Sequence, residues 1–180
     1  SVSPASPTPS ASVSSSPAPV VTGALNVSLA SDSPAAANVP AKGALVPFTK
    51  VVFTATGGKV VIDSLTVQRV GLSVDADFSG VVLIDPQGNQ VGYAKTLGST
   101  HQAVFGNDLT IPAGTSATYT LAGNIDTSPT AGDIAALSLV SVVTKDSASV
   151  GGSLPVTGSS MTMVNITIGT VTVATGGLSP

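Results

Sequence analysis

The sequence predicts an all-β sandwich, and three observations support this fold class. Hydrophobic residues make up 42% of the 180-residue chain, but aromatic residues make up only 3% and charged residues only 8%. All nine acidic residues are aspartate, so the chain lacks glutamate, a good helix former, while it is rich in the valine and threonine that favour strands. Apolar and polar residues alternate over many short segments, and no segment shows a sustained helical period.

The N-terminal segment 1–21, SVSPASPTPSASVSSSPAPVV, has a low-complexity composition of Ser, Pro and Ala. It has few large apolar side chains, so burial cannot offset the entropy lost on ordering. Proline-rich chains prefer the extended polyproline II conformation, and Ser/Thr with Pro is typical of glycosylated stalks. We expect a leader or linker here, either a flexible spacer or a segment ordered only against a neighbouring subunit. One sandwich domain is then expected over residues 22–168.

Strands are expected wherever the two-residue alternation appears. In the first of them Leu25, Val27 and Leu29 alternate with Asn26 and Ser28, which places Asn26 on the outer face. Segments with this alternation cover residues 25–29, 45–56, 59–71, 81–85, 90–95, 102–105, 109–111, 117–125, 134–145 and 161–174.

The pattern also predicts two local features, a bulge within one strand and a turn between two others. The apolar positions slip phase at Asp63 and Ser64, which is typical of a β-bulge. Pro86 and Gly88 lie between two alternating runs and predict a hairpin. About eight or nine strands without helices between them favour an immunoglobulin-like sandwich. The absence of cysteine and tryptophan excludes the antibody subfamily of that architecture.

Two segments, one at the start of the expected domain and one just after its end, have similar sequences. GALNVSLASDSP starts at Gly23, and GTVTVATGGLSP starts at Gly169, which stands 146 residues later. We therefore expect an extra strand over residues 169–180, with Gly169, Val171 and Val173 as its characteristic positions; chance similarity in a chain rich in Gly, Thr and Val is the alternative. An uncovered strand invites edge pairing, so we expect it to act as a donor strand for the next subunit, to begin a next repeat, or to fold back on its own domain.

Three segments carry a resemblance to a known group. SDSPAAANVPAKGALVPFTKVVFTATGG, VDADFSGVVLIDPQGNQVG and LTIPAGTSATYTLAGNID resemble the immunoglobulin-like domains of tandem-repeat surface proteins from uncultured bacteria. The resemblance covers residues 22–168 and is diagnostic of fold more than of function. It implies several such domains in series, whereas this sequence holds one complete copy. The difference favours either polymerisation of single domains, as in donor-strand pili, or a piece of a longer array.

The charge pattern limits the partners. The net charge is −3 and no basic cluster is present, which argues against binding to nucleic acid or to an anionic membrane surface. No apolar run approaches the roughly 20 residues of a membrane-spanning helix. Together with the Ser/Pro leader, this composition predicts an extracellular protein at the cell surface.

Residues suited to catalysis are scarce. His101 is the single histidine, and it stands in a polar stretch, where we expect an exposed residue outside any catalytic triad. Without cysteine and with one histidine, a zinc site lacks ligands. Paired aspartates could serve a glycosidase, but the chain has no tryptophan and two tyrosines to line a sugar cleft. We expect no enzyme activity and no cofactor.

Asp75 and Asp77 form the one weak metal candidate. Two carboxylates in a loop can bind Ca²⁺ together with backbone carbonyls and a third acid such as Asp126 or Asp146. The complete calcium-loop pattern is missing, and aspartate also caps turns.

Asn26 and Asn165 head two N-glycosylation sequons, each on a predicted strand. A chain this rich in Ser and Thr also produces such triplets by chance, and that alternative stays open.

Two functions follow as hypotheses. The first is a structural subunit of an extracellular filament, pilus or surface layer, a homopolymer joined head to tail by β-strand complementation. The alternative is an adhesin or ligand-binding module of a longer cell-surface protein, with a surface glycan or receptor as its partner.

Overall fold

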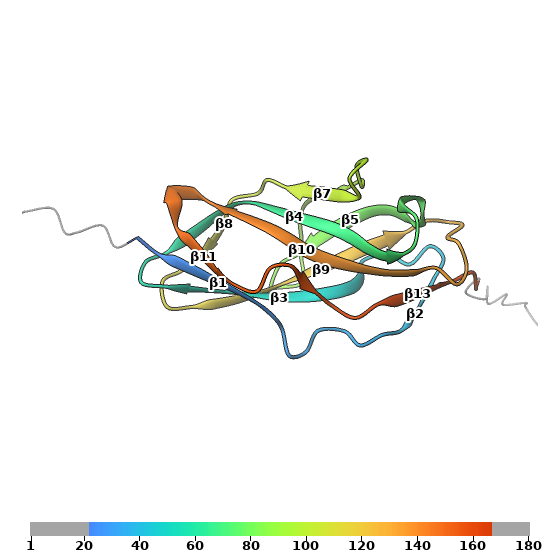
Figure 1. Ribbon diagram of the computed structural model, residues 1–180, viewed down its shortest axis with the longest axis horizontal. Helices are drawn as coiled ribbons and strands as arrows, with labels where there is room; N and C mark the ends of the chain where they lie inside the picture. The colour runs from blue at the N-terminus through green and yellow to red at the C-terminus, as the bar shows by residue number, and fades with distance from the viewer. Residues whose placement is uncertain (1–21, 167–180) are drawn as a thin grey trace, which may run out of the picture.

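The structure, a computed structural model, describes residues 22–166 apart from the side chain of Asp146. Two β-sheets face each other, as Figure 1 shows. The side chains between them form one hydrophobic core. Two single-turn 3₁₀ helices, η1 (Asp75–Asp77) and η2 (Lys145–Ser147), are the helical elements of the described part. The predicted all-β, two-sheet architecture is confirmed.

The first sheet has six strands. Their order across the sheet is β11 (Ser149–Gly152), β1 (Ala24–Leu29), β3 (Val46–Thr56), β9 (Ser116–Ile125), β5 (Phe78–Ile84) and β6 (Gln90–Lys95). All neighbours pair antiparallel except β1 and β11, which run parallel.

The second sheet has seven strands. Its main order is β2 (Asn38–Pro40), β13 (Met161–Val164), β10 (Ile134–Thr144), β4 (Val60–Leu72) and β7 (Gln102–Phe105), while β12 (Val156–Thr157) pairs with β10 and β8 (Leu109–Ile111) pairs with β4. The described residues thus form thirteen strands, and the predicted count of eight or nine is too low. The predicted set lacks β2, β11 and β12, whose two to four residues show no clear apolar alternation.

Side chains from the inner faces of both sheets fill the core. The alternation in β3 buries Val51, Phe53 and Ala55, each at most 1% exposed. Phe53 packs edge-on against Tyr119 with ring centroids 5.7 Å apart. Each buried side-chain nitrogen or oxygen of the described residues has a hydrogen-bond partner, so the core carries no uncompensated polar group.

Both local predictions for turns are confirmed. The β4–β10 ladder shifts register at Asp63, which is exposed between buried Ile62 and Leu65. The β5–β6 hairpin closes through a hydrogen bond from the Gly88 amide to the Asp85 carbonyl, 3.0 Å long, and Gly88 has a φ of 86°. The chain reverses here because glycine tolerates that backbone conformation.

The described chain begins and ends at opposite ends of the long axis (Figure 1). Gly23 lies against the turn between β3 and β4, because a β-carbon at position 23 would stand 2.6 Å from the carbonyl oxygen of Gly58. The last strand lies at the far end of β4, where the Met163 amide donates to the Asp133 carbonyl beside the start of β10. β4 has 13 residues, so about 40 Å separates the two points.

Candidate functional site

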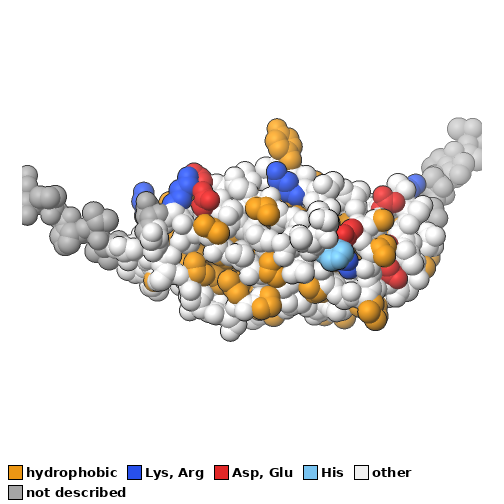
Figure 2. Space-filling model, turned by 45° about the horizontal axis from the view of Figure 1, so that its top comes forward, with side chains coloured by type: hydrophobic (Ala, Val, Ile, Leu, Met, Phe, Trp, Pro, Cys, Tyr) orange, Lys and Arg blue, Asp and Glu red, His pale blue; other side chains and the backbone are white. Residues whose placement is uncertain are grey.

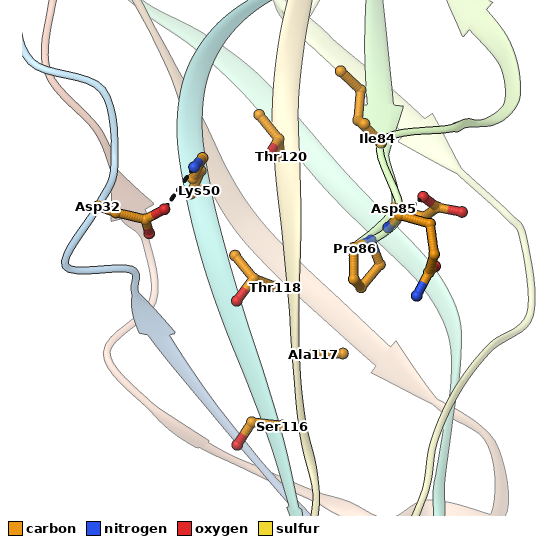
Figure 3. Close-up of a pocket in the computed structure, with 11 residues that line it drawn as sticks. Asp32, Lys50, Ile84, Asp85, Pro86, Ser116, Ala117, Thr118 and Thr120 are labelled. Carbon is orange, nitrogen blue, oxygen red and sulfur yellow. Dashed lines mark hydrogen bonds and ion pairs between the residues drawn. The ribbon is translucent and has the colours of Figure 1, made fainter.

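A hollow of about 620 Å³ lies on the outer face of the six-stranded sheet. Three hydroxyl side chains of β9, those of Ser116, Thr118 and Thr120, form a row along it, as Figure 3 shows. They face outward because the residues between them alternate to the other face, where Tyr119 is buried. The loop that carries Asp32 forms one wall, and the hairpin turn Asp85–Gly88 forms the other.

Both carboxylates of the hollow already have partners. The Nζ atom of Lys50 lies 2.6 Å from an Asp32 oxygen, and this hydrogen bond holds the pKa of Asp32 below its ordinary value. The Asp85 carboxylate accepts the backbone amides of Asn89 and Gln87, at 2.8 and 2.9 Å, and these bonds lower its pKa. The residues that line the hollow include no aromatic ring. They can therefore form polar contacts with a ligand but offer no stacking platform.

The predicted metal residues Asp75 and Asp77 stand together on η1 but turn to different partners. Asp75 accepts from Arg69 Nε at 2.6 Å and lies 2.7 Å from His101 Nδ1. Asp77 is 1% exposed and accepts the backbone amides of Thr130 and Val74, at 2.8 and 3.2 Å. Within residues 22–166 no group of three or more acidic or histidine side chains could hold a metal ion. The calcium site stays a prediction.

Two further acids, Asp126 and Asp146, were named for that site. The Asp126 carboxylate accepts the Ser128 amide at 3.1 Å, as an aspartate in a turn does. The side chain of Asp146 lies outside the described part of the chain.

Sequence patterns did not reveal the ionic cluster around Arg69. The Arg69 side chain is only 7% exposed, and its Nη1 also donates to the Ser73 carbonyl at 2.6 Å. Desolvation favours the protonated form of Asp75, but the hydrogen bonds from Arg69 and His101 outweigh it and lower the pKa of Asp75. A signal was present in the sequence, because Arg69 is the one arginine of the chain and lies in a strand whose only other charged residue is Asp63.

The carboxylate of Asp133 lies near this ionic cluster. Desolvation and the neighbouring Asp77 carboxylate raise the pKa of Asp133. Two like charges held close disfavour joint ionisation, so this corner of the fold is sensitive to pH.

His101 is exposed, as predicted, and sits in a turn with a φ of 60°. Figure 2 shows the histidine beside acidic and basic side chains on an otherwise sparsely charged face. Its hydrogen bonds in the described structure join it to the Asp75 carboxylate and to the backbones of Arg69 and Gly98. None of these hydrogen bonds joins His101 to a hydroxyl group, which a catalytic triad would require.

The remaining predicted positions divide into two groups. Asn26 is exposed on β1, as predicted, and Asn165 is exposed just after the end of β13 rather than within a strand. Both side chains are therefore open to solvent. Gly169, Val171 and Val173 of the extra strand lie outside the described residues.

A second hollow, of about 410 Å³, follows the free side of β1. β1 pairs with β3 as far as Leu29 but with β11 only as far as Val27. At Gly152 the chain leaves β1 with a φ of 97° and crosses to the other sheet. Leu29, 47% exposed, lines the opening together with Pro155 and Val156.

Comparisons with known proteins leave the family open. No known protein family matches the sequence, and no curated protein matches it. A solved structure of a family 123 glycoside hydrolase from Clostridium perfringens, studied for glycolipid glycan hydrolysis, is similar with a TM-score of 0.38 and 13% identity. The similarity covers 79% of this chain and 27% of that one, so this chain spans about a quarter of that protein's length. A likeness at this level carries no argument about activity.

Among the described residues, no helix has the length and apolar character needed to cross a membrane.

Proposed function

We propose that the protein is a structural subunit of an extracellular filament, pilus or surface layer, assembled head to tail by β-strand complementation. The observation that carries the proposal is that the described sandwich begins and ends at opposite ends of its long axis. Gly23 lies at the β3–β4 turn, and the chain leaves β13 about 40 Å away, beyond the opposite end of β4. A unit built in this way passes the chain from one end to the other, so units joined through their ends extend along one line (Figure 1).

The connection between units is heterologous. One end of a sandwich meets the other end of its neighbour, and such a contact continues into a filament unless a rotation closes it into a ring. Residues 169–180, whose sequence is similar to that of residues 23–34, supply the connecting strand.

The sandwich belongs, in this proposal, to the immunoglobulin-like architecture. Constant-type immunoglobulin domains arrange strands A, B, E and D in one sheet and G, F and C in the other. Here the order β1-β3-β9-β5 faces β13-β10-β4, and these strands follow the same succession along the chain. The short strand β2 runs parallel to β13 at the sheet edge and adds to that pattern.

An extracellular, non-catalytic role is part of the same proposal. The low charge, the hydroxyl-rich surface and the Ser/Pro leader suit a surface layer. The Asp75–His101 pair lacks a nucleophile among its described hydrogen bonds, and the hollow on the six-stranded sheet holds only carboxylates that have partners.

The experiment compares the complete chain with a variant that lacks residues 169–180. Negative-stain microscopy and light scattering of concentrated protein should show linear assemblies for the complete chain and monomers for the shortened one. Circular dichroism controls for folding, since the deletion leaves the described sandwich intact. Filaments that persist after the deletion, or monomers of the complete chain at every concentration, would contradict the proposal.

The hydroxyl-lined hollow favours a second candidate, an adhesin or ligand-binding module. A volume of about 620 Å³ lies within the usual range for small-ligand sites. A glycan and surface-protein screen would show saturable binding that Thr118→Trp abolishes by filling the hollow. Thr110→Trp, at an exposed position of β8 in the other sheet, is the matched control and should leave binding unchanged.

A further inference from the structure

The place that β1 occupies makes specific demands on its occupant. Position 23 must be glycine, because a β-carbon there would meet the carbonyl oxygens of Gly58 and Lys59 at 2.6 and 2.9 Å. Leu25 and Val27 are each 1% exposed and point into the core, whereas Asn26 between them faces solvent. Beyond the strand, the Ser33 hydroxyl accepts the Lys50 amide at 3.1 Å. A strand that fits this place needs all of these features in the same spacing.

The segment 169–180 has them. Its residues at the four demanding positions are Gly169, Val171, Val173 and Ser179, which stand 146 residues after Gly23, Leu25, Val27 and Ser33. The exposed positions differ freely, since Thr172 replaces Asn26 and Leu178 replaces Asp32. At buried Ala30 the counterpart is the smaller Gly176, which also fits. The similarity is thus retained where the structure constrains β1 and lost where it does not.

Chain length prevents this segment from occupying the β1 place of its own sandwich. Gly169 follows Val164, the last residue of β13, by five residue steps, which span at most about 18 Å. The β3–β4 turn that Gly23 contacts lies about 40 Å away, at the other end of β4. A strand in the β1 orientation must therefore enter a different sandwich.

We propose that residues 169–180 of one copy occupy the β1 place of a second copy, between β3 and β11, with Gly169 against the β3–β4 turn. This inference rests on the proposed function and identifies the acceptor site of its head-to-tail contact. The incoming strand replaces the resident β1, and the side chains of Val171 and Val173 enter the core where those of Leu25 and Val27 lie. Backbone hydrogen bonds to β3 and β11 are exchanged one for one.

The hollow beside β1 gives the exchange a starting point. Ser28 and Leu29 pair with β3, but their other side faces the opening of about 410 Å³ and no described strand pairs with it. This end of β1 is held by β3 alone, so it can leave β3 first, and the incoming segment can then pair with β3 there and advance toward Gly23. Resident and incoming strands compete for the same place, and the resident one is attached to its own chain. Exchange therefore depends on protein concentration.

Disulfide trapping tests the register directly, because the native chain has no cysteine. Asn26 faces Thr54 in the β1–β3 ladder, so Thr172 of the incoming strand should face Thr54 of the acceptor. One population carries Thr172→Cys and the other Thr54→Cys, and both are otherwise complete. Mixed at high concentration in a thiol–disulfide buffer, they should form a covalent heterodimer. Thr110→Cys, exposed on β8 of the other sheet, is the control acceptor and should give only the background of random collision.

Two glycine variants add a readout that random collision would not produce. Gly169→Ala in the donor should lower the heterodimer yield by about tenfold, because its methyl group meets the β3–β4 turn, whereas Leu178→Asp should not lower the yield. Gly23→Ala in the acceptor weakens only the resident strand and should raise the yield. Gly169→Ala and Thr172→Cys lie outside the described sandwich, so its melting temperature should stay the same and serves as the folding control.

The outcomes separate this inference from the proposed function. If linear assemblies depend on residues 169–180 but the Thr172→Cys donor and the Thr54→Cys acceptor do not cross-link above the Thr110→Cys background, the acceptor site is wrong and the filament proposal stands. If cross-linking occurs but is insensitive to Gly169→Ala, the β1 register is overturned. If neither assemblies nor cross-links form, both proposals fail.

Discussion

Thr49 on β3 and Leu137 on β10 are joined across the core by a hydrogen bond from the Thr49 hydroxyl to the Leu137 carbonyl. The same hydroxyl accepts the Gly158 amide at 3.1 Å. Thr49 is completely buried, so one side chain links both sheets and the segment that leads into β13. It lies at a register shift in the β3–β9 ladder, which turns it away from the regular alternation.

Replacing Thr49 by valine should destabilise the fold by about 1–3 kcal/mol, because the Leu137 carbonyl and the Gly158 amide lose their buried partner. Thr49→Ser keeps the hydroxyl and removes one methyl group, so its loss should be smaller, about 1 kcal/mol. Urea unfolding followed by circular dichroism measures both. An unchanged stability of Thr49→Val would show that the hydroxyl contributes nothing beyond packing.

The ion pair between Asp75 and Arg69 gives a second prediction. Asp75→Asn removes the charge opposite an arginine whose side chain is only 7% exposed, and the cost should be about 2 kcal/mol at pH 7. His101→Gln removes the half-exposed partner of the same carboxylate and should cost less than about 0.5 kcal/mol. Thermal unfolding at constant pH distinguishes the two. A His101→Gln loss as large as that of Asp75→Asn would contradict this assignment.

The pH dependence of Asp75 follows from the direction of its shift. Its folded-state pKa lies below the unfolded value of 3.8, so its stabilising effect is complete above that value and disappears as pH falls through the folded pKa. The difference in unfolding free energy between the native protein and Asp75→Asn should therefore be constant near neutral pH. It should shrink once the pH falls well below 3.8. Unfolding curves at several pH values measure this difference.

Asp133 should show the opposite sign. Its folded-state pKa is raised, so between 3.8 and that pKa the folded state binds more protons than the unfolded state, and stability falls as pH rises. Asp133→Asn removes this effect while its amide oxygen can still accept a hydrogen bond. The variant should melt higher than the native protein at pH 7 and show no such gain at pH 3. A gain that does not change with pH would show that the charge of Asp133 is not its cause.

The sequence predicted the fold where alternation decides it and failed where contacts between distant residues decide it. The long strands, the bulge at Asp63 and the hairpin turn at Gly88 follow from local patterns of apolar residues and turn formers. β2 was not among the predicted strands, because its three residues form a strand only through their parallel pairing with β13. Local propensity carries no information about such a pairing.

The ionic cluster shows the same limit at the level of side chains. The closeness of Asp75 and Asp77 in the sequence suggested a shared metal site. In the structure, hydrogen bonds to Arg69 and His101 orient the Asp75 carboxylate. His101 stands 26 residues after Asp75 in the chain. The topology brings them together because β7, which follows His101, pairs with β4, which contains Arg69. A residue in such a cluster can be recognised as unusual from the sequence, but its partners cannot be named.

Two adjacent glycines of β11 provide a matched pair for the last prediction. Gly152 has a φ of 97°, and a β-carbon there would run into the Val27 backbone, whereas at Gly151 the nearest atom would be the Leu25 carbonyl oxygen at 3.8 Å. Gly152→Ala should therefore cost about 1–3 kcal/mol and loosen the β1–β11 pairing. Gly151→Ala should be neutral or stabilising by up to about 1 kcal/mol, because it restricts the unfolded chain without a clash. Hydrogen exchange should show lower protection of the β1 amides in Gly152→Ala alone; equal protection in both variants would mean that β11 does not hold β1 in place.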